Sequence, residues 1–415
     1  MFNPAIAPGP HDYVYTLMTA RSTKQKQFTQ EFQLQVAETK YDLTAGAFYF
    51  HENSPATNIL GIFQPVVNGV AIVDPTLDFI FGSGPSSDRS INDSIAGYVQ
   101  GTYHITDQWD FTAGARYTED KRKSEIYSVA AAQGSIIGIG TYKVKFDKTN
   151  YNVVLAYKPN RNITAYGKVS TGYVAGGLLS GIPYNPEELT SYEIGVKSQL
   201  FDNRLRANAA VFYSDYKDLQ IQNFINGVQT FENAGKANLT GFELEVMALP
   251  MQGLTLEGSV GYTDTSYDEF LTTDPRTGLK GDVADIADTS LQSKWTLRLG
   301  AQYDAPKFEN GSFVTGRIDA NWRSKYPLTT LPIYNAGGAS LATLDSTGRM
   351  RDAYWLVSGR VGLANIPAGS GTASLSLYGD NIFDEDYVAF GPPVLALQGT
   401  YGRGATYGVE FGFQF

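Results

Sequence analysis

The sequence predicts an all-β protein, a transmembrane antiparallel up-and-down β-barrel with about 16 readable strands. Three observations predict it. Apolar and polar residues alternate with period two in run after run, the connections alternate between short and long, and aromatic and turn-forming residues abound, with 27 Tyr, 23 Phe and 43 Gly. No apolar run approaches the ~20 residues that a membrane helix needs, so strands are the segments expected to cross a bilayer.

The alternation is clearest in the middle of the chain. Residues 192–200 and 205–213 each place apolar side chains on one face and polar side chains on the other. The tight polar turn 201–204 joins them as a hairpin, and Asn226-Gly227 supplies the positive backbone dihedrals of a two-residue turn. The run 242–248 then returns as a third strand. We therefore expect three neighbouring strands with their charged residues on one face.

Similar runs extend along the rest of the chain. In order, they cover residues 28–36, 43–49, 91–103, 109–117, 163–169, 254–262, 295–303, 314–322 and 407–415. Four tryptophans lie at predicted strand ends, namely Trp109, Trp295, Trp322 and Trp355. Because indole rings favour the boundary between membrane and water, these positions predict an aromatic girdle.

The predicted connections fall into two classes. Short ones lie near residues 37–41, 105–108, 158–162, 201–204, 249–253, 304–311 and 364–371. Long ones lie near residues 51–90, 119–145, 174–189, 264–288, 326–352 and 380–398, with tight exceptions at 22–26 and 226–227. Short turns at one end and long loops at the other are typical of outer-membrane barrels, whose short turns are periplasmic. This parity predicts the outer membrane of a Gram-negative cell, with a periplasmic C-terminus.

Composition excludes several classes of function. The net charge of −10 and the pI near 4.9 argue against nucleic acid as a partner. Without cysteine there is neither a disulfide nor a thiolate metal site. His11, His51 and His104 lie far apart without metal-ligand spacing, so we expect surface or loop residues. No catalytic triad or carboxylate pair stands out, and we expect neither an enzyme nor a cofactor.

Two glycine-rich stretches and one acidic stretch are further candidate sites. Residues 134–140 and 172–181 lack the Gly-Lys-Ser/Thr sequence of a phosphate loop and predict flexible loops or strand edges. Residues 264–288 hold seven carboxylates without the pattern of a calcium loop, which predicts a solvated acidic loop.

Charged residues on the polar faces of the strands are the better candidates for contact with a solute, because a lumen lined by both signs of charge can hydrate and guide a polar molecule. These candidates are Arg116, Lys168, Glu193, Lys197, Arg206, Glu243, Glu245, Glu257, Arg298, Arg317 and Arg360.

Several segments resemble one family of outer-membrane proteins. The run YEIGVKSQLFDNRLRANAAVFYSDYKDLQ, followed by NAGKANLTGFELEV, is similar to a hairpin of the TonB-dependent receptor barrel. Segments QEFQLQV, AGAFYFHE, GYVAGGL and SLYGDNIFDEDY follow the family in order, and the closing YGRGATYGVEFGFQF resembles its last strand. The resemblance covers essentially the whole chain.

This resemblance implies a barrel of about 22 strands, an N-terminal plug domain and a short segment that engages TonB. It also implies TonB-dependent uptake of a scarce solute, such as a ferric siderophore, and lumen charges that pair with one another or face the plug. The start of the chain lacks the features of a signal peptide. We therefore expect residues 1–415 to form one incomplete barrel domain, with the plug and further strands encoded upstream.

Two alternatives remain at this stage. A passive-diffusion porin is one, because about 16 strands is itself a porin count. A secreted β-rich surface protein or adhesin is the other.

Overall fold

The computed structural model describes residues 16–415 apart from 64–65, 68–69, 72–83, 129–137, 226–227, 275–278, 332–349 and 391–399. Within that part of the chain, no helix has the length and apolar content needed to cross a membrane. The predicted turn at Asn226-Gly227 falls outside the described residues, as do His11 and most of the glycine-rich stretch 134–140.

Nearly all described elements are strands. The main sheet contains β1 (Thr16–Thr23), β2 (Lys26–Ala37), β3 (Tyr41–Phe63), β6 (Gly84–Thr106), β7 (Trp109–Ser128), β8 (Gly140–Asn160), β9 (Ile163–Val174), β12 (Glu187–Leu200), β13 (Leu205–Ile225), β14 (Val228–Met251), β15 (Leu254–Thr273), β16 (Lys280–Asp282), β17 (Trp295–Asp304), β18 (Phe313–Arg323), β21 (Tyr354–Ala368), β22 (Gly371–Asp380) and β25 (Thr406–Gln414). Four small strand pairs and one 3-10 helix complete the list: β4 (Val66–Val67) with β5 (Val70–Ala71), β10 (Gly177–Leu179) with β11 (Ile182–Tyr184), β19 (Tyr326–Pro327) with β20 (Met350–Arg351), β23 (Val388–Phe390) with β24 (Thr400–Tyr401), and η2 (Ala284–Ile286).

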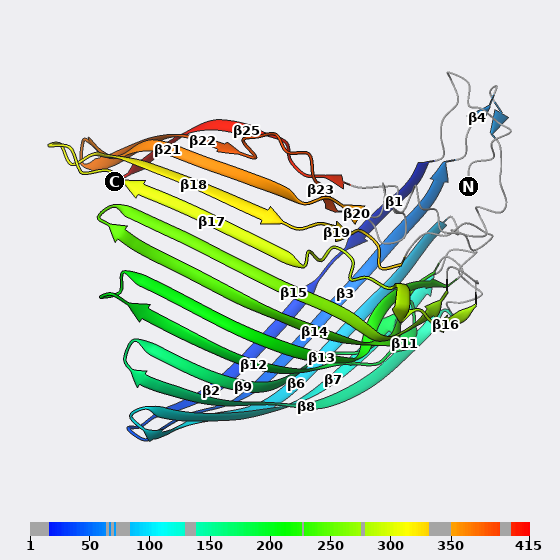
Figure 1. Ribbon diagram of the computed structural model, residues 1–415. Helices are drawn as coiled ribbons and strands as arrows, with labels where there is room; N and C mark the ends of the chain where they lie inside the picture. The colour runs from blue at the N-terminus through cyan, green and yellow to red at the C-terminus, as the bar shows by residue number, and fades with distance from the viewer. Residues whose placement is uncertain are drawn as a thin grey trace.

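The main sheet is a single antiparallel ladder in chain order, which curves from β1 and β2 round to β25 (Figure 1). The strands β1 and β2 lie end to end along β3, and β16 and β17 lie end to end along β15. The 17 strands of the sheet therefore occupy fifteen positions around it. Among the described residues, no pairing joins β25 to β1 or β2. The predicted all-β antiparallel fold class is confirmed.

One predicted connection is wrong. Residues 22–26 were expected to join two strands, but Thr23 pairs with Ala56 and Lys26 pairs with Asn53, so the chain continues along the same neighbour. The Lys24 backbone N–H donates to the Pro55 carbonyl at 3.1 Å, which bridges the interruption. This explains why fifteen positions replace the roughly 16 strands of the prediction.

The short and the long connections lie at opposite ends of the sheet, as the sequence predicts. Short connections gather at the end that carries the C-terminus, at the left of Figure 1, whereas the longer ones lie at the other end. The strands are longer than expected, however. β7 runs to Ser128 and β8 starts at Gly140, so much of the predicted loop 119–145 is strand. The outer halves of these strands carry charged residues, whose alternation has little hydrophobic contrast.

The turn at 201–204 matches its prediction and has an unusual backbone. Phe201, Asp202 and Asn203 have φ values of 54°, 53° and 64°, in the left-handed region. Asp and Asn tolerate this region better than other non-glycine residues. Leu200 then pairs directly with Leu205, which fixes the register of β12 against β13.

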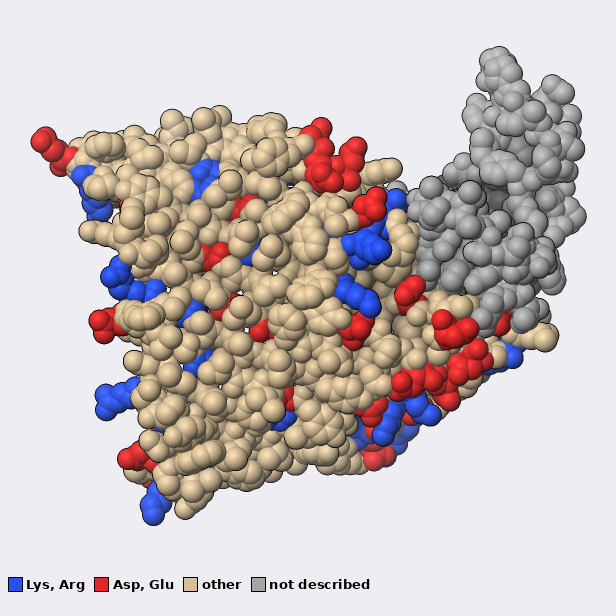
Figure 2. Space-filling view, viewed as in Figure 1, with Lys and Arg blue, Asp and Glu red and all other residues tan. Residues whose placement is uncertain are grey.

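Large apolar side chains cover the outer face of the sheet. Ile194 and Val211 pair with each other across two strands, yet they are 68% and 56% exposed. Figure 2 shows mostly uncharged surface across the middle of the strands, with Lys, Arg, Asp and Glu more frequent towards both ends. Such exposure is unfavourable in water but favourable in lipid, which is where a transmembrane barrel places its apolar face.

Two adjacent alanines of β13 test this assignment of faces. Ala209 pairs with Val196 and Leu244 on the outer face, whereas Ala210 pairs with Gly195 and Glu243 on the inner face. We expect Ala209→Arg to lower the free energy of unfolding in phospholipid vesicles by about 2–4 kcal/mol, because its guanidinium would enter hydrocarbon. Ala210→Arg should change the free energy of unfolding little, because its side chain would point to the polar inner face. Urea titration followed by tryptophan fluorescence measures both, and equal losses would contradict the assignment.

Candidate functional site

The inner face of the sheet carries all eleven charged residues that the sequence singled out. They lie on nine strands: Arg116 on β7, Lys168 on β9, Glu193 and Lys197 on β12, Arg206 on β13, Glu243 and Glu245 on β14, Glu257 on β15, Arg298 on β17, Arg317 on β18 and Arg360 on β21. Directly opposed residues share a face, and the register connects them across the sheet. Their contact with a ligand stays a prediction.

One group of these residues is neutralised by ion pairs, most of which cross between strands. The Arg317 guanidinium lies 2.8 Å from Glu257 and 2.7 Å from Asp319, and Arg298 lies 3.4 Å from the same aspartate. Arg360 makes two parallel hydrogen bonds of 3.0 Å to the Glu410 carboxylate on β25. Such two-pronged contacts hold the wall rigid.

Sequence reasoning missed the carboxylates Asp319 and Glu410. Both stand in the alternation of their strands, on the polar face, and this signal would have included them. Arg116 differs from the paired arginines, since its guanidinium stacks over the rings of Phe48 and Tyr98 at 5.2 Å and 5.5 Å.

A second group surrounds Tyr166 on β9 and is less neutralised. The Tyr166 hydroxyl donates to Glu193 at 2.6 Å, and the Lys197 ammonium lies 5.7 Å from the centre of its ring. Gly195 permits this arrangement, because a Cβ there would come within 2.5 Å of the Tyr166 hydroxyl. Among the described residues, four further side chains of this wall make no hydrogen bond or ion pair, namely Lys168, Arg206, Glu243 and Glu245. They are free to contact a solute.

The long-loop end of the inner face holds a cluster that the sequence did not reveal. Arg122 lies 3.2 Å from Asp120, and the Tyr173 hydroxyl donates to the same carboxylate. The Nη1 atom of Arg122 is buried and has no hydrogen-bond partner among the described residues. Burial raises the pKa of the nearby Tyr184 phenol. The cluster was missed because residues 119–145 and 174–189 were expected to be loops.

The hairpin of β10 and β11 packs on the inner face of the sheet. On one side its turn meets β7 and β8, since a Cβ at Gly181 would come within 3.1 Å of Tyr142 and Ile126 side-chain atoms. On the other side the Tyr184 ring lies 5.1 Å from Phe231 of β14. The hairpin thus lies over the inner face at the long-loop end, between β7–β8 and β14. Gly172 lies near the end of β9, Gly177 begins β10 and Gly181 lies in the turn that follows, so these glycines occupy strand ends and a turn, in line with the strand-edge prediction.

Two amide side chains hold the ends of this hairpin. The Asn233 side chain accepts from the Asn185 N–H at 2.7 Å and donates to the carbonyls of Asn185 and Asp218, both at 2.9 Å. The Gln220 side chain donates to the carbonyls of Ala175 and Asn185 at 3.3 Å and 3.0 Å. These bonds fix the hairpin where it enters and leaves the wall.

The connections between β18 and β21 and between β22 and β25 pack at this end into a small core of their own, together with the start of β21. Its buried residues are Tyr326, Leu328, Tyr354 and Val388. The Tyr326 hydroxyl donates to the Val388 carbonyl at 2.9 Å, and burial raises the pKa of this phenol. Nearby, two backbone N–H groups hydrogen-bond the Asp282 carboxylate and hold its pKa below the usual value. The acidic stretch 264–288 is therefore partly strand and partly anchored, not a freely solvated loop.

His51, His104 and the four tryptophans lie in strands. His51 and His104 were expected at the surface or in loops. They lie in strands and not in loops, but their side chains are 39% and 30% exposed; His51 lies in β3 beside Asp93, and His104 lies in β6 between Asp42 and Asp110. In the described ranges, no group of three or more His, Asp or Glu residues is arranged to hold a metal ion.

The tryptophans lie at strand ends, as expected from the sequence. Trp109 begins β7 at the short-turn end and its ring lies 4.6 Å from that of Tyr157. Trp322 and Trp355 form a pair of rings at the other end, 6.3 Å apart.

Removing the Asn233 amide should release the β10–β11 hairpin. Because Asn233→Ala deletes three hydrogen bonds, each worth about 1 kcal/mol, we expect amide hydrogen exchange in residues 175–185 to be about ten-fold faster or more. Asn238→Ala is a matched control on the same strand, since that side chain bonds Tyr213 and Asp268 instead. Unchanged exchange in Asn233→Ala, measured by mass spectrometry, would show that the hairpin is held by other contacts.

The sequence is similar to known proteins of one family. The sequence model of the family described as TonB dependent receptor-like, beta-barrel matches residues 2–382. The chain is 25% identical over 338 residues to the pesticin receptor of Yersinia enterocolitica, covering 76% of this chain and 42% of that protein. It is 26% identical over 231 residues to the probable TonB-dependent siderophore receptor PiuA of Acinetobacter baumannii, covering 53% of this chain and 29% of PiuA.

Solved structures agree at the level of the fold. The ferric yersiniabactin uptake receptor FyuA from Yersinia pestis superposes with a TM-score of 0.69 at 18% identity, covering 96% of this chain and 56% of FyuA. PiuA from Acinetobacter baumannii also gives a TM-score of 0.69, at 16% identity, covering 94% of this chain and 56% of PiuA. The chain thus spans about half the length of these relatives. Because the family match extends over most of its residues, the chain belongs to the TonB-dependent receptor β-barrel family, whose members are outer-membrane transport receptors.

Proposed function

We propose that this chain forms the barrel of an outer-membrane receptor for TonB-dependent uptake of a scarce solute, of the ferric siderophore class. The family match over residues 2–382 carries the proposal. The names of relatives support the solute class, since one is a probable siderophore receptor and another a ferric yersiniabactin uptake receptor. The porin alternative loses its support, because the matching family is one of TonB-dependent receptors.

The geometry suits such a role. The mouth of the barrel carries a partly unsatisfied arginine, Arg122, beside the phenols Tyr173 and Tyr184. Arginine and aromatic groups suit an anionic, partly aromatic chelate. Below them the inner wall offers the free charges around Tyr166. A solute that enters from the long-loop end would meet Arg122 first and this wall second.

In this proposal the energised step belongs to the receptor as a whole, in which a plug domain engages TonB. The plug stays a prediction, as does the assignment of residues 1–415 to a single barrel domain. The proposal also includes a periplasmic C-terminus. It is supported by the short connections, which share the end of Phe415 and resemble periplasmic turns of outer-membrane barrels.

Uptake by cells tests the function. We expect cells that express the receptor, in a strain without its own siderophore receptors, to accumulate radiolabelled iron from a ferric siderophore only when TonB is present. Uptake that persists without TonB would indicate a passive porin.

The same assay tests the mouth. Arg122→Gln should raise the concentration for half-maximal uptake about ten-fold or more, because charged hydrogen bonds contribute about 1.5–3 kcal/mol. Arg161→Gln is the matched control, since this exposed arginine lies in the short turn after β8. Equal effects of the two substitutions would remove Arg122 from the site.

Orientation has its own test, because the chain lacks cysteine and a single thiol can be introduced. We expect Ser370→Cys, in the short turn between β21 and β22, to react with a membrane-impermeant maleimide only after the outer membrane is permeabilised. Leu279 lies at the opposite end and is 71% exposed. We expect Leu279→Cys to react in intact cells. The reverse pattern would place the C-terminus outside.

A further inference from the structure

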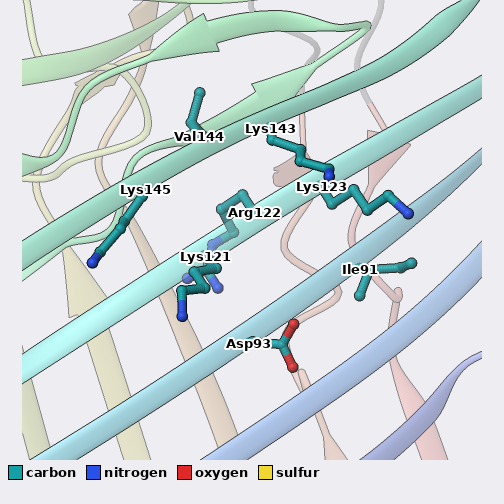
Figure 3. Close-up of a pocket in the computed structure, with 8 residues that line it drawn as sticks. All are labelled: Ile91, Asp93, Lys121, Arg122, Lys123, Lys143, Val144 and Lys145. Atoms are coloured by element: carbon teal, nitrogen blue, oxygen red, sulfur yellow. The ribbon is translucent and has the colours of Figure 1, made fainter.

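A group of four lysines lies on the outer face of the sheet, away from the inner site. Lys121 and Lys123 of β7 stand directly opposite Lys145 and Lys143 of β8. These four side chains, which we call the lysine quartet, line a groove of about 370 Å³ together with Ile91 and Asp93 of β6, and Figure 3 also labels Arg122 of β7 and Val144 of β8 in its lining. Arg122 and Val144 alternate with the lysines along their strands. Like charges that face each other across two strands destabilise a sheet, so their presence in two adjacent rows calls for a compensating anion.

The carboxylates of the protein neutralise the quartet unevenly. We call the pair Lys121 and Lys145 the lower row and the pair Lys123 and Lys143 the upper row. In the lower row, Glu119 lies 3.0 Å from Lys121 and 2.8 Å from Lys145, and Asp147 stands opposite Glu119 on the same face. Asp93 is engaged by His51 at 2.7 Å. The lower row is therefore close to balance.

The upper row has an excess of positive charge. Its one carboxylate, Glu125, pairs with Lys123 and also lies 3.6 Å from Arg89. Among the described residues, Lys143 makes no ion pair or hydrogen bond. Three cations thus share one carboxylate here. An anion bound between Lys123 and Lys143 would relieve the repulsion between them.

The position of the quartet indicates the kind of anion. On the same face, Phe111, Ala115 and Tyr117 of β7 form part of the apolar band. Lys123 lies six residues beyond Tyr117, which corresponds to roughly 15 Å along the membrane normal at ~3.3 Å per residue and ~40° tilt. Flexible lysine stems can reach back from there towards the membrane surface. The groove therefore lies at the level of lipid head groups and not in the barrel mouth.

The apolar surface below the quartet points to a lipid and not to a free anion. Ile91 lies in the groove itself, and Ile95, which is 56% exposed, continues the apolar surface towards the band. A free phosphate would gain nothing from these side chains, whereas acyl chains would cover them. We propose that Lys123 and Lys143, supported by Arg89, bind the phosphate of an anionic lipid head group in the outer leaflet, with its acyl chains against the outer face of β6–β8.

The test uses the purified chain and vesicles of phosphatidylcholine with or without bisphosphorylated lipid A as the probe. We expect tighter binding to the phosphorylated vesicles, and weaker binding as salt is raised. The double substitution Lys123→Gln with Lys143→Gln should weaken that preference about 30-fold, since each basic residue near a charged surface contributes about a five-fold factor. Lys123→Arg with Lys143→Arg should retain it.

A charge-matched control separates this site from general attraction. Lys40→Gln with Lys307→Gln removes the same charge from exposed lysines in two short turns at the opposite end. This variant should bind as the wild type does. Equal losses in both double variants, or equal binding to dephosphorylated lipid A, would overturn the proposal. Competition by inorganic phosphate at the affinity of the lipid would also overturn it, because the site would then select a free anion.

Discussion

The structure depends on one continuous ladder of backbone hydrogen bonds. In hydrocarbon there is no water to satisfy a peptide group, so each strand must satisfy its neighbour along its whole membrane-spanning length. The antiparallel order from β2 round to β25 does this without crossovers for every strand between the first and the last, and in the described part of the chain each connection in the main sheet joins neighbouring strands. Even the interruption between β1 and β2 keeps a bond, from the Lys24 N–H to the Pro55 carbonyl. The side chains are left free to specialise by face.

That freedom separates the two surfaces. The outer face carries Ile194, Val211 and similar side chains, exposed because lipid replaces a protein core. The inner face carries charges that are paired where the wall is rigid, as at Arg317 and Asp319, and unpaired around Tyr166. Small residues shape it, since Gly195 makes room for the Tyr166 ring. Function can therefore vary on the inner face without disturbing the contacts that hold the sheet in the membrane.

The strands also extend beyond the apolar band, and there a different environment applies. The outer halves of β7 and β8 carry charges on both faces. Inward, Asp120 and Arg122 meet the β10–β11 hairpin at the mouth. Outward, the lysine quartet stands at the level of head groups. One pair of strands thus presents a solute-facing cluster and a lipid-facing cluster, because consecutive side chains point to opposite sides.

The sequence by itself determined the fold class, the 201–204 hairpin, the separation of short from long connections and the placement of the eleven charges on one shared face. All of these follow from a period of two, which is a local property. Tertiary structure decided what depends on register between distant segments. It paired Arg360 with Glu410 and folded the β10–β11 hairpin inward. It also extended strands through 119–128, where charge alternates with charge and hydrophobic contrast is lost, so that only cross-strand hydrogen bonds reveal the strand.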